Sequence, residues 1–183
     1  MVVGAGLSGI LAAKNAAKNN FKTLLVDEKN ELGGLTVYEN NEFNKIDNKT
    51  PSEWIKKEIE ELKNIKNLEI KTRTSVAAYH QYNYLLAREN LTDHLEAKDK
   101  TNKIRQRLLK IRAKKVILAT GALERPLIFN NNDRPGIMLS SAVKKYSEFY
   151  GVACGNKNVF FTNNDSAYES ALSLYLSLIH ISE

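Results

Sequence analysis

The sequence has few of the residues that would mark a secreted, membrane-bound or metal-binding protein. Its 183 residues include one cysteine, Cys154, together with three histidines and three prolines. One cysteine cannot form an internal disulfide, and no stretch approaches the roughly 20 apolar residues of a membrane span. The chain starts with no basic segment ahead of an apolar one, so we expect no signal peptide. These absences predict a cytoplasmic protein with no membrane partner.

Side chains that commonly carry out catalysis are equally scarce. His80 and His94 fall in polar surroundings with no cysteine or second histidine at ligand spacing, and Cys154 has no CxxC partner. Tyr79, Tyr82 and Tyr84 are expected to pack on a sheet. We therefore predict no catalytic residue and no metal site. His180 is set aside because the final "LIHISE" has neither a helix cap nor a following strand. Both ends of the chain are expected to be truncated.

The charge is basic but does not indicate a nucleic-acid surface. Lys and Arg number 27 against 21 Asp and Glu, which gives a net charge of +6. The lysines are scattered, and the richest basic stretch, residues 103–115, alternates charges with Leu and Ile as a half-exposed strand does. That stretch lacks the aromatic residues on which bases stack. No nucleic-acid partner is expected.

The hydrophobic pattern alternates between strand and helix signals. Strands are predicted at residues 1–3, 22–26, 68–76, 82–90, 104–113, 114–121 and 159–161, and helices at 7–19, 50–65, 140–151 and from 166 onward. Residues 114–121 form a nearly unbroken apolar run, so this strand is expected to be buried on both faces. The strands between residues 70 and 112 are expected to form an antiparallel insertion in an α/β fold.

A glycine-rich joint follows the first strand. Gly4, Gly6 and Gly9 fit the pattern G-x-G-x-x-G, in which the glycines serve the tight turn, the approach to a pyrophosphate and the packing of the helix on the strand. The helix opening at Leu7 and Ser8 would offer free N–H groups to phosphates. The second strand ends at Asp27-Glu28, where an acid holds the ribose hydroxyls of a dinucleotide. An acid at this position favours free ribose hydroxyls over a 2′-phosphate.

Two further segments narrow the class. Gly33-Gly34 and the strand "ILATGA" (residues 117–122) resemble elements of two-dinucleotide-binding flavoproteins of the glutathione reductase group. The resemblance implies a Rossmann-like parallel sheet of that type and places the residue near Val76 over the adenine. The residues expected to hold the cofactor are Gly4, Gly6, Leu7, Ser8, Gly9, Asp27, Glu28, Lys29, Gly33, Gly34, Leu35, Val76, Thr120 and Gly121.

A second strand–turn–helix joint, residues 158–172, contains no glycine. Asn163, Asn164 and Asp165 would place side chains where a pyrophosphate lies, and Asp165 adds a negative charge. We therefore expect no dinucleotide there, and Asp165 or Ser166 is predicted to cap the helix. The expected domains are a dinucleotide-binding domain over residues 1–151, with its β insertion at about 70–112, and the start of a degenerate second half over 152–183.

Longer segments carry a more specific resemblance. "TRTSVAAYHQYNYLLARENLTDHL", "RQRLLKIRAKKVILATGALERPLIFNNNDRPGIMLSSA" and "VFFTNNDSAYESAL" are similar to the α subunit of heterotetrameric sarcosine oxidase. The resemblance implies an NAD-binding subunit, partner β, γ and δ subunits, and FAD and FMN on the β subunit. It also implies that sarcosine is demethylated to glycine, with the one-carbon unit passing to tetrahydrofolate on a C-terminal domain absent from these residues.

Two alternatives stay open. The glycine loop by itself fits FAD as well as NAD, so the chain could be the FAD-binding α subunit of an opine, proline or amine dehydrogenase complex. A non-catalytic assembly scaffold with a vestigial nucleotide fold is a second alternative, which Gly4, Gly6, Gly9 and Asp27 together disfavour.

Overall fold

The computed structural model describes residues 1–39 and 45–179, and the chain forms two units. Unit 1 is Met1–Val37 with Ser52–Gly121, and unit 2 is Tyr38–Pro51 with Ala122–Glu183. His180 lies outside the described residues. Among those that are described, no helix is long and apolar enough to cross a membrane. The predicted division into nucleotide-binding halves at residue 151 stays a prediction.

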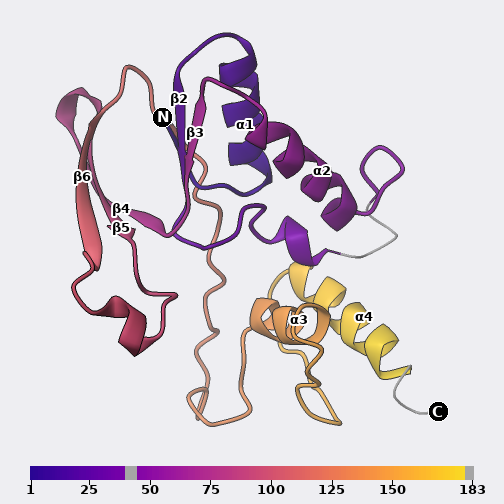
Figure 1. Ribbon diagram of the computed structural model, residues 1–183. Helices are drawn as coiled ribbons and strands as arrows, with labels where there is room; N and C mark the ends of the chain where they lie inside the picture. The colour runs from indigo at the N-terminus through magenta and orange to yellow at the C-terminus, as the bar shows by residue number, and fades with distance from the viewer. Residues whose placement is uncertain (40–44, 180–183) are drawn as a thin grey trace. The chain divides into compact units, whose positions relative to one another are not determined.

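A parallel sheet forms the middle of unit 1 (Figure 1). Its strands are β1 (Val2–Val3), β2 (Thr23–Val26), β3 (Leu68–Lys71) and β7 (Ile117–Leu118), in the order β3-β2-β1-β7. Val2 lies opposite Leu25 on one side and Ile117 on the other. The sheet confirms the predicted α/β class with a parallel sheet.

The alternation of side chains along β1 and β2 divides unit 1 into three layers. Val2 and Leu25 face α1 (Leu7–Lys18) and α2 (Pro51–Lys63), where they pack with Ile10, Ala13, Ile55 and Leu62 in one buried cluster. Val3 and Val26 face the opposite way and pack with Leu85 and its neighbours in an antiparallel sheet. Because successive strand residues point to opposite faces, each strand contributes to both cores.

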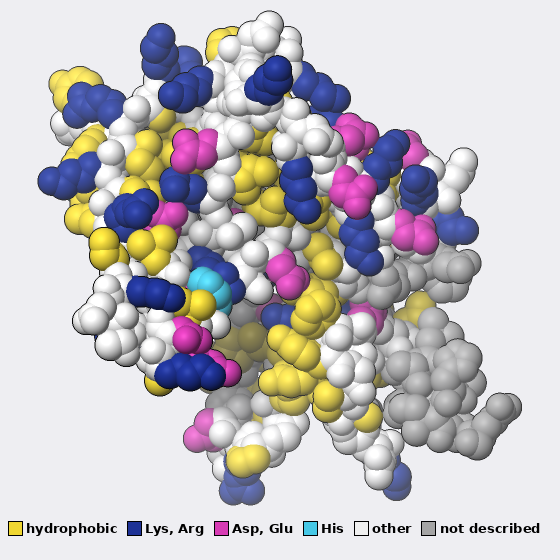
Figure 2. Space-filling view, viewed as in Figure 1, with side chains coloured by type: hydrophobic (Ala, Val, Ile, Leu, Met, Phe, Trp, Pro, Cys, Tyr) yellow, Lys and Arg dark blue, Asp and Glu magenta, His cyan; other side chains and the backbone are white. Residues whose placement is uncertain are grey.

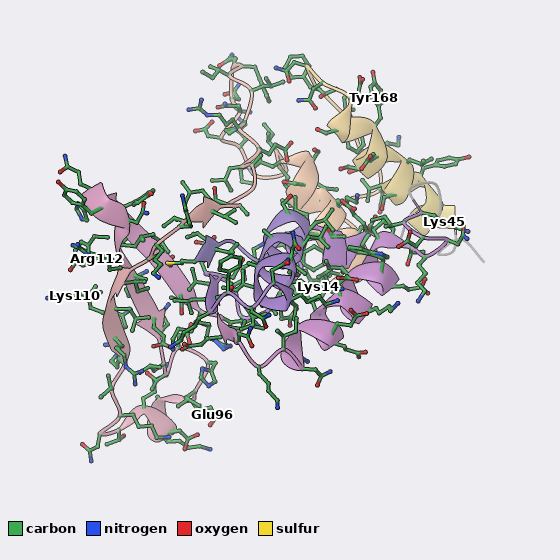
Figure 3. All side chains as sticks on the ribbon, turned by 90° about the horizontal axis from the view of Figure 1, so that it is seen from above. Lys14, Lys45, Glu96, Lys110, Arg112 and Tyr168 are labelled. Carbon is green, nitrogen blue, oxygen red and sulfur yellow. The ribbon has the colours of Figure 1, made fainter. Side chains whose placement is uncertain are left out.

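The antiparallel sheet contains β4 (Thr74–His80), β5 (Tyr84–Asn90) and β6 (Gln106–Arg112), in that order. On β6, Leu109 and Ile111 are half-buried, whereas Lys110 and Arg112 are exposed and project outward (Figure 3). The hairpin between β4 and β5 turns through Tyr82 and Asn83, both with positive φ. Tyr82 is 82% exposed at this turn, so the prediction that it packs on the sheet is wrong. Between β5 and β6 the polar stretch includes a short 3₁₀ helix, Ala97–Lys100.

One predicted strand proves to be two. The stretch 68–76 divides between β3, in the parallel sheet, and β4, in the antiparallel sheet. The break lies at Arg73, whose φ of 51° turns the chain out of the extended conformation. The alternating pattern of side chains continues across the break, and for that reason the sequence shows no boundary there.

The expectation of a fully buried strand at residues 114–121 is wrong. Only Ile117 and Leu118 form a strand, and their side chains are 43% and 59% exposed. β7 is an edge strand with one neighbour, and the two buried clusters of unit 1 are centred on β1 and β2. An apolar run indicates what a strand can bury, but its place in the sheet decides how much is covered.

Unit 2 is built around α3 (Ser140–Glu148) and α4 (Ser166–Ile179), which contact each other. Ser173 donates a hydrogen bond of 2.6 Å to Glu148, and Lys144 pairs with Glu169 at 3.6 Å. Ala167 and Leu174, both on α4, are buried. A short 3₁₀ helix, Thr36–Tyr38, leads into this unit.

The joint at residues 158–172 differs from its prediction. Residues 159–161 form no strand, and Val159 is 96% exposed, since the described part of unit 2 offers no neighbouring strand for a ladder. The helix does form, but Asn164 supplies its capping acceptor, not Asp165 or Ser166. The Asn164 side-chain oxygen accepts the Ser166 N–H at 3.1 Å, and Thr162 Oγ1 accepts the Asn164 N–H at 3.2 Å.

Candidate functional site

The loop over residues 4–9, called here the glycine loop, contains two glycines that the fold itself requires. Gly4 has a φ of 96°, and a Cβ on it would overlap the carbonyl oxygen of Ala119. Gly9 lies in the first turn of α1, and a Cβ there would overlap the carbonyl oxygen of Gly4. These two positions let β1, α1 and the segment after β7 come together, as the motif predicts.

Gly6 is different, because no protein atom requires it. Its φ of −73° and ψ of −174° are open to any residue, and a Cβ on it would meet nothing within 4 Å. It precedes α1 directly, and that helix begins with no side-chain cap and no acidic residue in its first turn. The N–H groups of Leu7, Ser8 and Gly9 therefore have no intrahelical partner and form the positive end of the helix dipole. Open space beside uncapped N–H groups fits a phosphate group.

The Gly33-Gly34 turn braces the glycine loop. The Gly33 N–H donates to the Ala5 carbonyl at 2.7 Å, and a Cβ on Gly34 would lie 2.9 Å from the Gly6 Cα. Both glycines have positive φ, 109° and 62°. Leu35, which follows, is 58% exposed. Gly33 and Gly34 therefore pack against the glycine loop, and they can do so because neither has a side chain.

Asp27 forms hydrogen bonds within the fold in addition to the ligand-binding role predicted for it. Its carboxylate accepts the Ala5 N–H at 2.6 Å through one oxygen and the Lys29 N–H at 2.8 Å through the other. A carboxylate has about four acceptor positions, so two remain for ribose hydroxyls. Asp27 therefore helps to fix the glycine loop through its bond to Ala5. The neighbouring Glu28 lies 3.4 Å from the Ser75 hydroxyl.

Of the other residues predicted to hold the cofactor, Thr120 and Gly121 lie in the segment after β7, which packs on the glycine loop. Val76 instead faces the core. Thr120 follows Ala119, and its backbone nitrogen lies 3.1 Å from the Cβ position of Gly4. Gly121 has a φ of 74° and ends unit 1. Val76 lies in β4, where its side chain packs toward Val3, Val26 and Leu85. A contact between Val76 and an adenine would therefore use the backbone.

An open hollow of about 370 Å³ lies at the carboxyl end of β2. Its lining residues are all polar or charged: Glu28, Lys29, Asn30, Arg73, Asp93 and His94. Arg73 and Asp93 were absent from the sequence prediction, since they come from separate segments and fit no motif. Among the described residues, no group of three or more His, Cys, Asp or Glu side chains is placed to hold a metal ion.

The charges on the visible face do not gather in one patch. Lys and Arg side chains are spread over it and are interleaved with Asp and Glu (Figure 2). This distribution is unlike the continuous basic stripe of a nucleic-acid-binding surface.

The glycine loop, the acid after β2 and the paired glycines all lie within the residues that one protein family matches. The family described as pyridine nucleotide-disulphide oxidoreductase matches residues 1–165. The chain belongs to this family. Its domain is therefore a dinucleotide-binding domain of the pyridine nucleotide-disulphide oxidoreductase type.

Individual proteins give a finer comparison. The sarcosine oxidase subunit alpha of Corynebacterium sp. (strain P-1) is 41% identical over 177 residues, and that of strain U-96 is 40% identical over 168. The alignments cover 97% and 92% of this chain but only 18% and 17% of those subunits. The chain thus spans less than a fifth of these relatives. Their similarity confirms the resemblance inferred from the sequence.

A solved structure supports the same fold. L-proline dehydrogenase from P. horikoshii superposes with a TM-score of 0.74 over 97% of this chain and 33% of its own, at 24% identity. At that identity the likeness shows the fold alone. The Rossmann-like architecture with an inserted antiparallel sheet is confirmed.

Proposed function

We propose that this chain is the nucleotide-binding part of the α subunit of a sarcosine oxidase complex, and that it binds NAD at the glycine loop. The observation that carries the proposal is Gly6. The fold places no atom against it, so glycine at this position leaves open space in which a ligand would approach the backbone. A vestigial fold would have no need of that space, which argues against a scaffold.

The proposed complex oxidatively demethylates sarcosine to glycine. The β, γ and δ subunits are its proposed partners, with FAD and FMN on the β subunit and tetrahydrofolate on a C-terminal domain of the α subunit. Similarity to sarcosine oxidase α subunits over nearly the whole chain supports this assignment. When bound, NAD supplies hydride chemistry, and the chain's own residues bind and orient it. The N–H groups at the start of α1 would contact the pyrophosphate, and Asp27 would contact the ribose.

FAD is the second candidate, because the same loop geometry serves either dinucleotide. Both ligands share an adenosine and a pyrophosphate, and the residues described above contact only that half. The preference for NAD rests on the similarity to sarcosine oxidase α subunits, and the residues around the loop do not decide between the two.

Calorimetric titration of NAD and FAD into the wild-type chain and a Gly6→Val variant tests the proposal. A branched side chain at Gly6 would fill the space beside the uncapped N–H groups while leaving the fold intact. We expect NAD binding to fall at least about tenfold, or 1.4 kcal/mol, with little change in unfolding free energy.

Lys18→Val, an exposed change at the far end of α1, is the matched control and should bind NAD normally. Equal NAD affinity in Gly6→Val and the wild type would rule out the glycine loop as the site. Tight FAD binding with no NAD binding would favour the amine dehydrogenase alternative.

A further inference from the structure

The hollow at the end of β2 brings together three separate segments of unit 1. Glu28, Lys29 and Asn30 come from the loop after β2, Arg73 from the link between the two sheets, and Asp93 and His94 from the loop after β5. It begins one residue beyond Asp27, where the adenosine ribose is placed in the proposed function. A group attached to the ribose would therefore enter this space.

The backbone of Arg73 is fixed on two sides. Its N–H donates to the Lys29 carbonyl at 2.8 Å, and its carbonyl accepts the Asn90 N–H at 2.9 Å. The positive φ of Arg73 is what allows both bonds to form at a turn between sheets. The side chain is thereby held at the hollow and does not extend freely into solvent, with 26% of its surface exposed.

Asp93 contacts the side chains of both Arg73 and His94. Its Oδ1 lies 3.2 Å from Nε of Arg73 and 3.4 Å from Nδ1 of His94. The hollow then contains Lys29 and Arg73 as positive charges against Glu28 and Asp93 as negative charges. The opposing charges balance, so the hollow suits a neutral hydroxyl and gives a phosphate dianion no net attraction.

We propose that Asp93 is a specificity-determining residue, which by pairing with Arg73 and His94 makes the hollow accept the 2′-hydroxyl of an adenosine and reject a 2′-phosphate. This inference rests on the proposed nucleotide site at the glycine loop. It assigns the preference for the 2′-hydroxyl to the loop after β5, which contains Asp93. That loop is distant in sequence from Asp27, the proposed ribose-binding acid after β2.

The probes are 5′-ADP and its 2′-phosphorylated form, adenosine 2′-phosphate 5′-diphosphate, which is called the bisphosphate below. They differ only in the 2′-phosphate, and their use does not depend on whether the dinucleotide is NAD or FAD. The wild type should bind 5′-ADP more tightly than the bisphosphate. Asp93→Ala should tighten binding of the bisphosphate by about two- to fivefold, the range for releasing a partly exposed ion pair, and leave 5′-ADP unchanged. Adding Arg73→Met to Asp93→Ala should remove the gain.

Glu96→Ala is the matched control, since Glu96 is an exposed acid in the same loop that pairs with Lys98. It should leave both affinities unchanged. An equal gain in Glu96→Ala would assign the effect to net charge and overturn the role of Asp93, as would an unchanged bisphosphate affinity in Asp93→Ala.

Two failures remain distinguishable. If the wild type fails to bind 5′-ADP, or if Gly6→Val binds it as tightly as the wild type, the nucleotide site itself is wrong. If 5′-ADP binding depends on Gly6 and Asp93→Ala still rejects the 2′-phosphate, only the specificity inference is wrong.

Discussion

Gly9 and Gly6 belong to one motif but are constrained by different things. Alanine in a helix is normally favoured over glycine by about 1 kcal/mol, so Gly9→Ala would stabilise α1 if space allowed. A Cβ at Gly9 instead overlaps the Gly4 carbonyl oxygen. We expect Gly9→Ala to destabilise unit 1 by about 2 kcal/mol, within the range for overpacking.

Urea unfolding of Gly9→Ala and Gly6→Ala measures this contrast. Gly6→Ala should unfold with nearly the wild-type free energy, because its Cβ meets no protein atom. A Gly9→Ala variant as stable as the wild type would mean that the glycine loop is looser than its packing on Ala119 and Gly4 indicates.

For single residues, the sequence predicts which glycines the backbone constrains better than it predicts which side chains contact one another. G-x-G-x-x-G identifies Gly4, Gly6 and Gly9 by pattern, since each spacing reports a local backbone demand. It cannot show that the Asp27 carboxylate accepts hydrogen bonds from the N–H groups of Ala5 and Lys29, nor that Arg73 forms an ion pair with Asp93. Those contacts join segments whose approach is fixed only by the tertiary fold.

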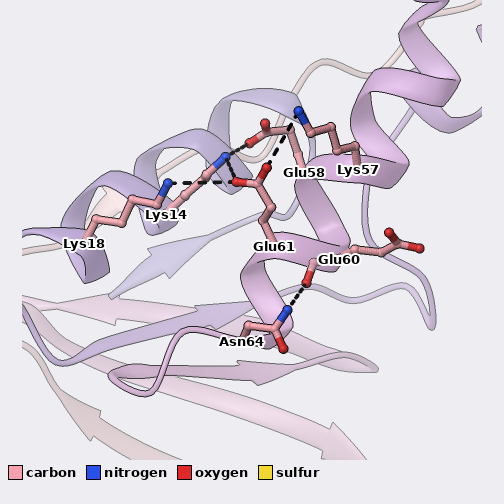
Figure 4. Close-up of polar contacts among 7 residues, drawn as sticks. All are labelled: Lys14, Lys18, Lys57, Glu58, Glu60, Glu61 and Asn64. Carbon is pink, nitrogen blue, oxygen red and sulfur yellow. Dashed lines mark hydrogen bonds and ion pairs between the residues drawn. The ribbon is translucent and has the colours of Figure 1, made fainter.

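A partly buried lysine, Lys14, links the first two helices of unit 1. Lys14 on α1 pairs with Glu58 and with Glu61 on α2, the latter at 2.7 Å (Figure 4). Burial lowers the pKa of Lys14, but hydrogen bonds and charge attraction from the two glutamates outweigh it, and the net pKa is raised. The side chains of Lys14 and Glu58 are 14% and 10% exposed.

Lys14→Ala should therefore cost about 3 kcal/mol of unfolding free energy, because Glu58 would stay buried without its cation. Lys57→Ala is the control, since Lys57 is 60% exposed and reaches Glu61 at 4.0 Å. The control should lose less than about 0.5 kcal/mol. Equal losses in urea unfolding of the two variants would contradict a special role for Lys14.

A carboxylate distant in sequence caps α3 in unit 2. Glu124 accepts the N–H groups of Ser140 at 3.0 Å and Ser141 at 2.8 Å. Partial desolvation of its carboxylate raises the pKa of Glu124, although the residue as a whole is exposed, but hydrogen bonds from Ser141 and Ser140 outweigh this effect and the net pKa is lowered. Because the folded pKa lies below the unfolded one, this cap contributes stability above the ordinary carboxyl range and loses it as pH falls through the folded value.

Glu124→Gln should remove that part of the pH dependence. The expected loss at neutral pH is about 0.5–1 kcal/mol, at the low end for caps because Glu124 is exposed. Melting curves recorded from neutral pH down to below the ordinary carboxyl pKa would show the wild type and variant converging at low pH. A constant difference between them across that range would exclude Glu124 as the titrating cap.

Helices, whose pattern is local, were predicted accurately. Strands were predicted poorly where their place in a sheet determines whether they form and how deeply they are buried. The amphipathic spacing of α1 and α2 predicts both helices to within two residues at each end. The split between β3 and β4 at Arg73 was missed, because both strands alternate in the same way. The strand expected at residues 159–161 failed for another reason, since a strand requires a neighbour that no local pattern supplies.

On the scale of the whole molecule, residues 122–139 form neither helix nor strand and expose large apolar side chains. Leu123 is 94% exposed and Ile128 is 96% exposed. We expect limited chymotrypsin digestion to cut first after Leu123 and Phe129, and a fragment containing unit 1 to accumulate. Mass spectrometry of the early products tests this. Early cleavage within β4, β5 or β6 would contradict it.

The pairing of β1 with β7 has a consequence for the order of events on the ribosome. Val2 and Val3 lie opposite Ile117 and Leu118, and the Gly4 turn closes against Ala119. During synthesis β1 must therefore wait for its partner β7 until more than a hundred further residues have been added. At about 5–20 residues per second this delay lasts roughly 6–20 seconds. A nascent chain halted before residue 117 would contain Gly4, Gly6 and Gly9 but would lack Ala119, against which the Gly4 turn packs.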